Sequence, residues 1–308
     1  MILLESHNVV IQNTLNDRFS KPGTIDVQFV DFDGVRFRLW TPQTKEVIVL
    51  SMNIRCWDEL VNYGVTDILQ REYGSRLMAQ AEADYHVSLE YAIDSIPPAG
   101  EERDAIVKAA SLLKRNALAA PFERAFATQK TLETSASIDM PGELMELHYR
   151  DEEAIYIQAS SDRVTVVFST IFKDETDRTF GKVFLQEFVD ARRQNTAMQH
   201  APQVLYSSRD PPLEIRNVAN LKRSDDVGYV TFVLFPQHFA NPDRMQSTIS
   251  HIQLFRDYLH YHIKCCKAYM HSRMRARVAE FLKILNRAKM ENKEVERKTV
   301  TGRTLVQR

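Results

Sequence analysis

The sequence predicts a mixed α/β (α+β) protein of two structurally related domains followed by one long C-terminal helix. Apolar strand-like segments and amphipathic helical segments alternate along the first 242 residues, as in mixed sheets with helices on one face. The order and spacing of these segments occur twice. Apolar residues then recur about every 3.6 residues from Met245 to Leu285, which is the period of an α-helix.

The first domain is expected over residues 1–127, as a small, largely antiparallel sheet with helices on one face. An amphipathic helix is predicted over 2–19 because Ile2, Leu3, Val9, Val10 and Leu15 fall at helical spacing. The segments that follow are predicted as strands at 25–32, 35–41 and 47–53, a helical stretch through 60–69, a strand at 86–91 and a helix through 106–126.

A polar segment over residues 128–143 is rich in Ser, Thr and small residues, and we interpret it as a linker. The second domain is expected over 144–242. Its predicted elements are strands at 144–149, 154–159 and 163–170, a helix at 174–193, and strands at 203–208 and 228–235.

The two domains match in the order and spacing of their elements. Val47 corresponds to Val164, and His86 to Gln203, each 117 residues apart. Side-chain identity between the copies is low, so the match predicts a structural duplication. One continuous sheet is the alternative topology.

The long helix is expected over residues 243–290, because neither Pro nor Gly interrupts residues 243–301. Residues 256–289 carry nine Lys and Arg against two acidic residues, whereas the whole chain has a net charge of −1. A helix of this length cannot bury its whole apolar stripe on the preceding domain, so it is predicted to bind another protein. The charged tail, 291–308, is expected to be disordered when free.

One short motif suggests an enzyme. Val30-Asp31-Phe32-Asp33-Gly34 resembles the nucleophile loop of haloacid-dehalogenase-like phosphotransferases. In those proteins the loop enters a helix, whereas residues 35–40 alternate as a half-buried strand does. We therefore interpret Asp33-Gly34 as a hairpin turn.

No other pattern predicts chemistry. His262 and Cys266 share a helix face at the spacing of two zinc ligands, but spacing alone is weak evidence and packing is the favoured interpretation. Neither a phosphate-binding glycine loop nor a supported catalytic triad occurs. We expect no catalytic residues, no metal and no cofactor, and hence no enzyme.

The composition limits the cell compartments and the kinds of binding partner that the chain can have. No stretch approaches twenty apolar residues, so no transmembrane segment is expected, and no basic leader indicates a signal peptide. Cys56, Cys265 and Cys266 do not form a disulfide framework, which favours reduced thiols in a cytosolic or nuclear protein. The basic helix could bind nucleic acid or an anionic membrane, but no nucleic-acid-binding motif supports the former.

Longer segments resemble a known family. They include MILLE at 1–5, HYRDEEAIYIQASSDRVTVVFSTIFKDE at 148–175, APQVLYSSRDPPLE at 201–214, GYVTFVLFPQH at 228–238, FRDYLHYHIKCCKAYMHSRMRARVAEFLKILNRAK at 255–289 and TVTGRT at 299–304. Over nearly its whole length the chain is similar to the second-subunit family of the actin-related protein 2/3 complex, whose members have a mass near 34 kilodaltons. Residues 76–84, 127–143 and 239–248 depart from the pattern of that family.

The resemblance implies a non-catalytic, actin-binding scaffold of the complex that nucleates and branches actin filaments. Such a subunit pairs with subunit 4 through the long helices, contacts the side of the mother filament, supports the two actin-related proteins and other subunits, and lies in cytoplasmic, cortical branched actin. We expect partner-helix packing by Ile252, Phe255, Leu259, Ile263, Met270, Met274, Val278 and Phe281. We expect filament contact by Arg273, Arg275, Arg277, Lys283, Arg287, Lys298 and Arg303.

Overall fold

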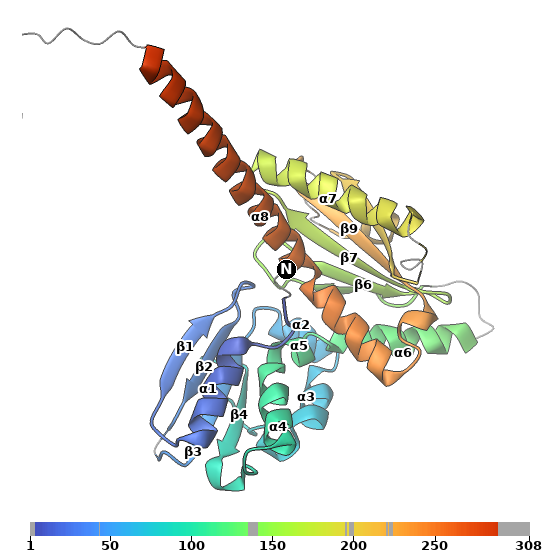
Figure 1. The fold of residues 1–308 in the computed structure, drawn as a ribbon. Helices are drawn as coiled ribbons and strands as arrows, with labels where there is room; N and C mark the ends of the chain where they lie inside the picture. Colours follow the sequence, from blue (N-terminus) through green and yellow to red (C-terminus); the bar gives the residue numbers. More distant parts are fainter. Residues whose placement is uncertain are drawn as a thin grey trace, which may run out of the picture. The chain divides into compact units, whose positions relative to one another are not determined.

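The computed structural model describes residues 4–42, 44–134, 141–194, 196, 200–219, 221 and 224–288. The chain divides into two compact units, Met1–Tyr261 and His262–Arg308, and the first unit contains both sheets (Figure 1). The predicted fold class is confirmed, because one antiparallel sheet has four strands, the other has five, and a long helix ends the described chain.

The first sheet is an antiparallel meander in the order β1-β2-β3-β4. Its strands are β1 (Asp26–Val30), β2 (Arg36–Trp40), β3 (Val47–Asn53) and β4 (Val87–Ala92), and the helices are α1 (Val9–Ser20), α2 (Trp57–Asn62), α3 (Val65–Tyr73), α4 (Glu101–Ser111), α5 (Leu113–Ala117) and α6 (Ala120–Thr134), with short 3-10 helices η1 (Gly74–Arg76) and η2 (Ile93–Ser95). Its apolar face pairs Leu39 with Leu50 and Leu50 with Leu89, all fully buried. Helix α1 covers this face, where the ring of Phe19 packs against that of Tyr91 with the ring centres 6.0 Å apart.

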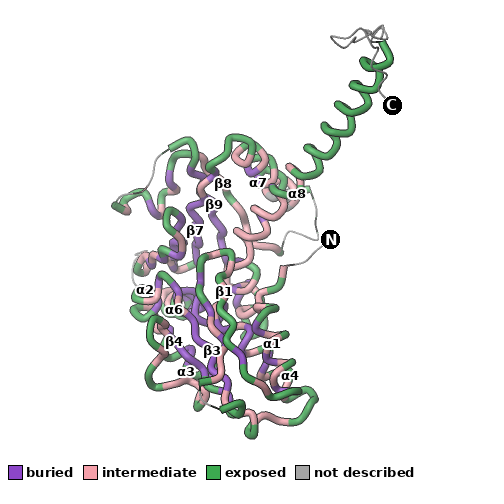
Figure 2. Tube along the Cα trace, turned by 90° about the vertical axis from the view of Figure 1, so that its left-hand side faces the viewer, coloured by how far each residue is buried: buried purple, intermediate pink, exposed green. Residues whose placement is uncertain are grey.

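The second sheet has the order β5-β6-β7-β9-β8, and every strand pair is antiparallel. The strands are β5 (Met145–Leu147), β6 (Ile155–Ala159), β7 (Val164–Ile171), β8 (Gln203–Ser208) and β9 (Val227–Leu234), and the remaining elements are α7 (Glu175–Gln194), η4 (Leu213–Ile215), η5 (Pro236–His238) and α8 (Pro242–Ala288). The central strands β7 and β9 are buried along almost their whole length (Figure 2). A strand with alternating faces is buried throughout only where both faces of its sheet are covered.

Different segments cover the two faces of the second sheet. On one face, Ala154, Tyr156, Val167 and Tyr229 form a core with Ile215 of η4. On the other face, the ring of Phe255 in α8 packs edge-on against Phe232 at 4.7 Å and lies 5.8 Å from Phe168. Helix α6 also packs on β6 and β7. The start of α8 is therefore part of the core of the second sheet.

The strand orders β1-β2-β3-β4 and β5-β6-β7-β9 are both antiparallel, but the predicted correspondence of His86 with Gln203 does not agree with the strand pairing. Val47 and Val164 each begin a central strand, and they pair with Ala92 at the end of β4 and Leu234 at the end of β9. The counterpart of β4 is therefore β9, and the paired positions 92 and 234 are 142 residues apart. A match of His86 with Gln203 makes β8 the counterpart of β4, whereas β8 is an additional edge strand beyond β9. Element spacing alone could not distinguish an inserted strand from a repeated one.

Two predicted boundaries also differ. Helix α1 begins at Val9, because the Asn8 side chain accepts hydrogen bonds from the backbone N–H groups of Val10 and Ile11 and so caps it. Helix α6 extends to Thr134 through the first part of the predicted linker. There the hydroxyls of Thr128, Thr131 and Thr134 bond back to carbonyls four residues earlier, and Gln129 is fully buried. The predicted tail, 291–308, lies outside the described residues.

Two isoleucines of α8 allow a direct test of its role in the core. Ile252 is 3% exposed and Ile284 is 63% exposed. We expect Ile252→Ala to lower the free energy of unfolding by about 3 kcal/mol, because it leaves a cavity in the core. The matched Ile284→Ala change should shift it by less than about 0.5 kcal/mol. Urea unfolding measured by circular dichroism checks both, and equal losses would contradict this packing.

Candidate interaction surface on helix α8

Helix α8 is continuous from Pro242 to Ala288, and its N-terminus follows from the local sequence. Pro242 occupies the first helical position, where a missing N–H has no cost. The Asn241 side chain accepts a hydrogen bond from the backbone N–H of Arg244 at 2.9 Å. Apolar side chains at helical spacing and the absence of Pro and Gly then allow the helix to continue.

Arg115 of α5 fixes the first turns of α8. Its guanidinium donates to the side-chain and backbone oxygens of Gln246 at 2.5 and 2.6 Å, and to Ser250 Oγ at 2.9 Å. In return, the side-chain amide of Gln253 donates to the Arg115 carbonyl at 3.2 Å. Arg115 is only 8% exposed, and this burial lowers the pKa of its guanidinium. These hydrogen bonds specify where along α8 the helix contacts α5.

Apolar contacts continue along the part of α8 that belongs to the first unit. Ile249, Ile252 and Leu259 are buried. Tyr258 exchanges hydrogen bonds with the backbone of Leu4, at 2.8 Å to its N–H and 3.0 Å to its carbonyl. The N-terminal segment is thereby attached to α8.

A seven-residue charge cluster joins this part of α8 to both sheets. Its members are Asp31, Asp33, Lys114, Arg150, Glu153, Arg256 and Asp257. Asp31 and Asp33 lie in the turn between β1 and β2, and Lys114 of α5 forms ion pairs with both carboxylates. We call this group the charge cluster.

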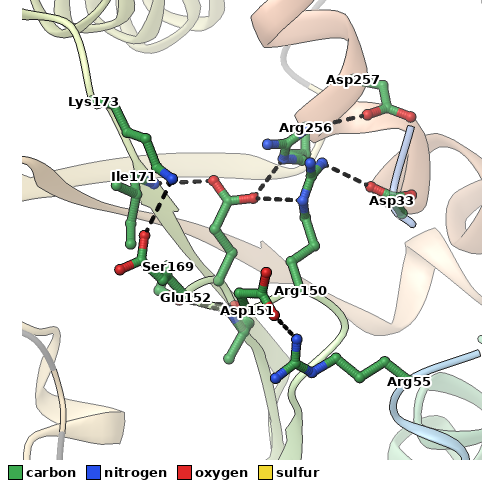
Figure 3. Close-up of polar contacts among 12 residues, drawn as sticks. Asp33, Arg55, Arg150, Asp151, Glu152, Ser169, Ile171, Lys173, Arg256 and Asp257 are labelled. Atoms are coloured by element: carbon green, nitrogen blue, oxygen red, sulfur yellow. Dashed lines mark hydrogen bonds and ion pairs between the residues drawn. The ribbon is translucent and has the colours of Figure 1, made fainter. Parts of the chain in front are cut away.

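Arg150 and Arg256 connect the remaining members of the charge cluster (Figure 3). Arg150 pairs with Asp33 at 3.2 Å and with Glu153 at 3.5 Å. Arg256 Nε lies 2.7 Å from the Glu153 carboxylate, whose other oxygen accepts from the Ile171 N–H at 3.0 Å. Arg256 also lies 3.6 Å from Asp257, its neighbour on α8.

The charge cluster shifts the pKa values of its two neighbouring aspartates in opposite directions. Burial opposes ionisation of Asp33, but Lys114 and then Arg256 and Arg150 outweigh it, so the pKa of Asp33 is lowered. Burial and then the charge of Asp33 outweigh the cations for Asp257, and they raise its pKa to about 6. Burial also opposes the charged form of Lys114, yet its two carboxylate partners raise its pKa above the usual value.

The second unit presents the candidate surface. Met270, Met274, Val278 and Phe281 are between 47% and 60% exposed, and they recur at three- or four-residue spacing. At 100° per residue these four side chains form one stripe along α8. Leu282, Ile284 and Leu285 are also large apolar side chains with substantial exposure. An exposed apolar stripe of this kind is typical of protein interaction sites, so we treat it as the candidate surface.

The predicted filament-contact residues that the structure describes are all exposed. The Arg273 guanidinium donates to Tyr269 Oη at 2.7 Å and lies 5.5 Å from the centre of that ring. Arg277 lies 3.7 Å from Glu280. Arg275, Lys283 and Arg287 are exposed as well, whereas Lys298 and Arg303 lie outside the described residues.

The predicted partner-packing residues fall into two groups. Ile252, Leu259 and Ile263 are buried within this chain, and Phe255 packs on the second sheet. Met270, Met274, Val278 and Phe281 are exposed. Sequence reasoning missed Arg115 and its contacts with α8. The available signal was the polar run Lys114-Arg115-Asn116 between Leu112-Leu113 and Ala117-Leu118-Ala119, which places polar groups where burial is expected.

The structure also shows what becomes of the Asp33-Gly34 motif and of the candidate metal ligands, and whether a described helix could span a membrane. Asp33-Gly34 is a hairpin turn as predicted, with Gly34 at a φ of 79° and Asp31 Oδ1 accepting from the N–H groups of Asp33 and Val35. Among the residues that the structure describes, no group of three or more His, Cys, Asp or Glu side chains is arranged to hold a metal ion. Within the same residues, no helix combines the length and apolarity needed to cross a bilayer.

Comparisons with known proteins agree over nearly the whole chain. A family model described as "Arp2/3 complex, 34 kD subunit p34-Arc" matches residues 50–292. The chain is 50% identical over 319 residues to "Actin-related protein 2/3 complex subunit 2" of Schizosaccharomyces pombe, covering 99% of each protein. It is 37% identical over 304 residues to the protein of the same name from Dictyostelium discoideum, covering 98% of each.

The role of Arg115 as the anchor of α8 is testable. Arg115→Met keeps much of the volume but leaves the Gln246 carbonyl and Ser250 without their buried donor. We expect a loss of about 2–4 kcal/mol in unfolding free energy. Amide hydrogen exchange over residues 244–255 should also be faster. The control Arg275→Met removes an exposed guanidinium and should leave both measurements unchanged, whereas similar behaviour of the two variants would contradict the anchor role.

Proposed function

The chain belongs to the Arp2/3 complex 34 kD subunit p34-Arc family, and from this premise we propose that it is a non-catalytic scaffold subunit of an actin-nucleating, filament-branching complex. In this proposal it pairs with subunit 4 through α8, contacts the side of the mother filament, and supports the two actin-related proteins that start the daughter filament. Its place in the cell is then the cytoplasmic actin cytoskeleton, in cortical branched-actin structures.

The observation that carries the proposal is the exposed apolar stripe of α8. Leaving a large apolar side chain in water forgoes about 1.5 kcal/mol or more. The four stripe residues Met270, Met274, Val278 and Phe281 therefore represent several kcal/mol available for binding. Residues 264–288 extend for about 37 Å as a helix, and a second amphipathic helix laid along the stripe covers it at matching spacing.

The cations support a second, separate contact. With Met274 and Val278 at the centre of the stripe, Lys283 and Arg287 lie roughly 180° and 220° around the helix from Met274. They are therefore on the opposite face from the apolar stripe. An arrangement of this kind lets a partner helix cover one face while the cations remain accessible to an acidic filament surface, which attracts them over a range set by salt.

The partner contact is tested by charging the stripe. Val278→Asp together with Phe281→Asp should prevent stoichiometric co-purification with subunit 4, because each change places an unpaired charge in the interface. Ala276→Asp lies roughly 200° away from Met274 and is the matched control. Ile263→Asp is less informative here, since Ile263 is already buried within this chain. Co-purification of the double variant at wild-type yield would refute the stripe as the partner surface.

The filament contact is tested by reversing charge on the opposite face. Lys283→Glu with Arg287→Glu should leave assembly intact and weaken co-sedimentation with actin filaments and branching, most strongly at low salt. Lys21→Glu with Lys130→Glu makes the same change of charge at exposed positions in the first unit, and should have little effect. Equal filament affinity of wild type and the Lys283/Arg287 variant at low salt would exclude these two contacts.

The alternative is an independent basic-helix adaptor that binds nucleic acid or an anionic membrane. It predicts that the chain without partners binds such ligands and releases them steeply as salt is added. Binding of that kind, combined with indifference to subunit 4 and to filaments, would replace the scaffold proposal.

A further inference from the structure

The charge cluster contains more carboxylates than cations. Its four carboxylates are those of Asp31, Asp33, Glu153 and Asp257, and its three cations are Lys114, Arg150 and Arg256. A partly buried group of this kind favours a state in which one carboxylate is neutral, because like charges at short range disfavour joint ionisation.

The geometry identifies which carboxylate is least compensated. Asp31 and Asp33 both pair with Lys114, and Asp33 also pairs with Arg150. Glu153 has both arginines and a backbone N–H. Asp257 forms one ion pair within the charge cluster, with Arg256 at 3.6 Å, and Arg256 is closer to Glu153. The charge of Lys114 also favours the ionised form of Asp257, but Lys114 is paired with Asp31 and Asp33. Figure 3 shows Asp257 and Asp33 on the same side of the two arginines.

The charged groups that act on Asp257 are Asp31 and Asp33 of the β1–β2 turn, Lys114 of α5 and Arg256 of α8. Tyr149, Arg150 and Glu153, of the segment between β5 and β6, act on the same cations and on Asp33. Burial raises the pKa of the Tyr149 hydroxyl well above its ordinary value, so it remains a neutral phenol.

We propose that Asp257 takes up a proton in the charge cluster, beside the ionised Asp33, and that this proton tightens the attachment of the β1–β2 turn and of the segment between β5 and β6 to α8. We call the contact of these two segments with α8 the joint. The joint opens less often in mildly acidic solution and more often as the pH approaches neutrality. This property belongs to the first unit itself and does not depend on the proposed function.

The direction of the pH dependence follows because proton binding by Asp257 is coupled to opening of the joint. The pKa of Asp257 is raised from 3.8 to about 6 by burial and by Asp33, so the closed joint binds the proton more tightly than an opened one. Its stability is therefore highest below the ordinary pKa of Asp257 and is lost as pH rises through about 6. The lowered pKa of Asp33 acts in the opposite sense, but only near and below pH 4. As the pH rises from 5.0 to 7.5, deprotonation of Asp257 raises the equilibrium constant for opening of the joint about tenfold.

Hydrogen exchange tests the joint in the full-length chain, purified with whatever subunits co-purify with it. After correction for intrinsic exchange, peptides covering 31–35, 149–155 and 252–258 should open about tenfold more often at pH 7.5 than at pH 5.0. Asp257→Asn mimics the protonated side chain, and should keep opening low at both pH values. Asp162→Asn, at an exposed aspartate, is the control and should keep the wild-type rise.

Two results would overturn the proposal: a flat wild-type profile, or a full tenfold rise retained by Asp257→Asn. If Asp257→Asn does not fold, carboxyl-carbon NMR of the wild type decides. A side-chain carboxyl that titrates near pH 6 and broadens when Asp33 is replaced by Asn supports the joint, whereas titration of every aspartate near pH 4 refutes it.

Discussion

The packing of Phe255 in α8 against Phe232 and Phe168 of the second sheet is the contact on which the rest of this protein depends. Strands β7 and β9 carry apolar side chains on both faces, and η4 with its neighbouring loop covers only one of them. On the other face, Phe255 of α8 packs against Phe232 and Phe168, and α6 packs on β6 and β7. Helix α8 therefore completes a core and continues into a segment, residues 268–288, in which every residue is exposed.

Polar contacts give this apolar packing a single register. Phe255 against Phe232 is compatible with small shifts along the sheet, because dispersion and the hydrophobic effect have little directionality. The hydrogen bonds from Arg115 to Gln246 and Ser250, and the ion pair from Arg256 to Glu153, are not compatible with such shifts. Buried charges contribute little net stability after their desolvation cost, but a misplaced one is expensive. Their value here is specificity for one arrangement of α8.

Much of the fold could be predicted from periodicity, while the site could be predicted only in part. Strands at 47–53 and 203–208 match the structure to the residue, and α8 begins at the proline that ends its loop. The correspondence of β8 with β4 failed because spacing carries no information on pairing. The split of the apolar stripe into buried Ile252 and exposed Val278 could not be predicted, because both have the same period and chemistry. Arg115 was missed because an arginine in a sequence normally indicates a surface position.

The revised repeat gives α8 a counterpart in the first half of the chain. After β4 come η2 and α4, and after β9 come η5 and α8, in the same order and at nearly the same spacing. Helix α4 has 11 residues and α8 has 47. The anchored beginning of α8 thus occupies the same place in the element order as α4, and the exposed remainder, which we call the outgrowth, is the part by which α8 exceeds α4 in length. Different constraints then act on the buried beginning of α8 and on its exposed outgrowth. Substitutions in the outgrowth can follow changes in a binding partner through evolution, while the packing of the sheet beneath α8 stays constant.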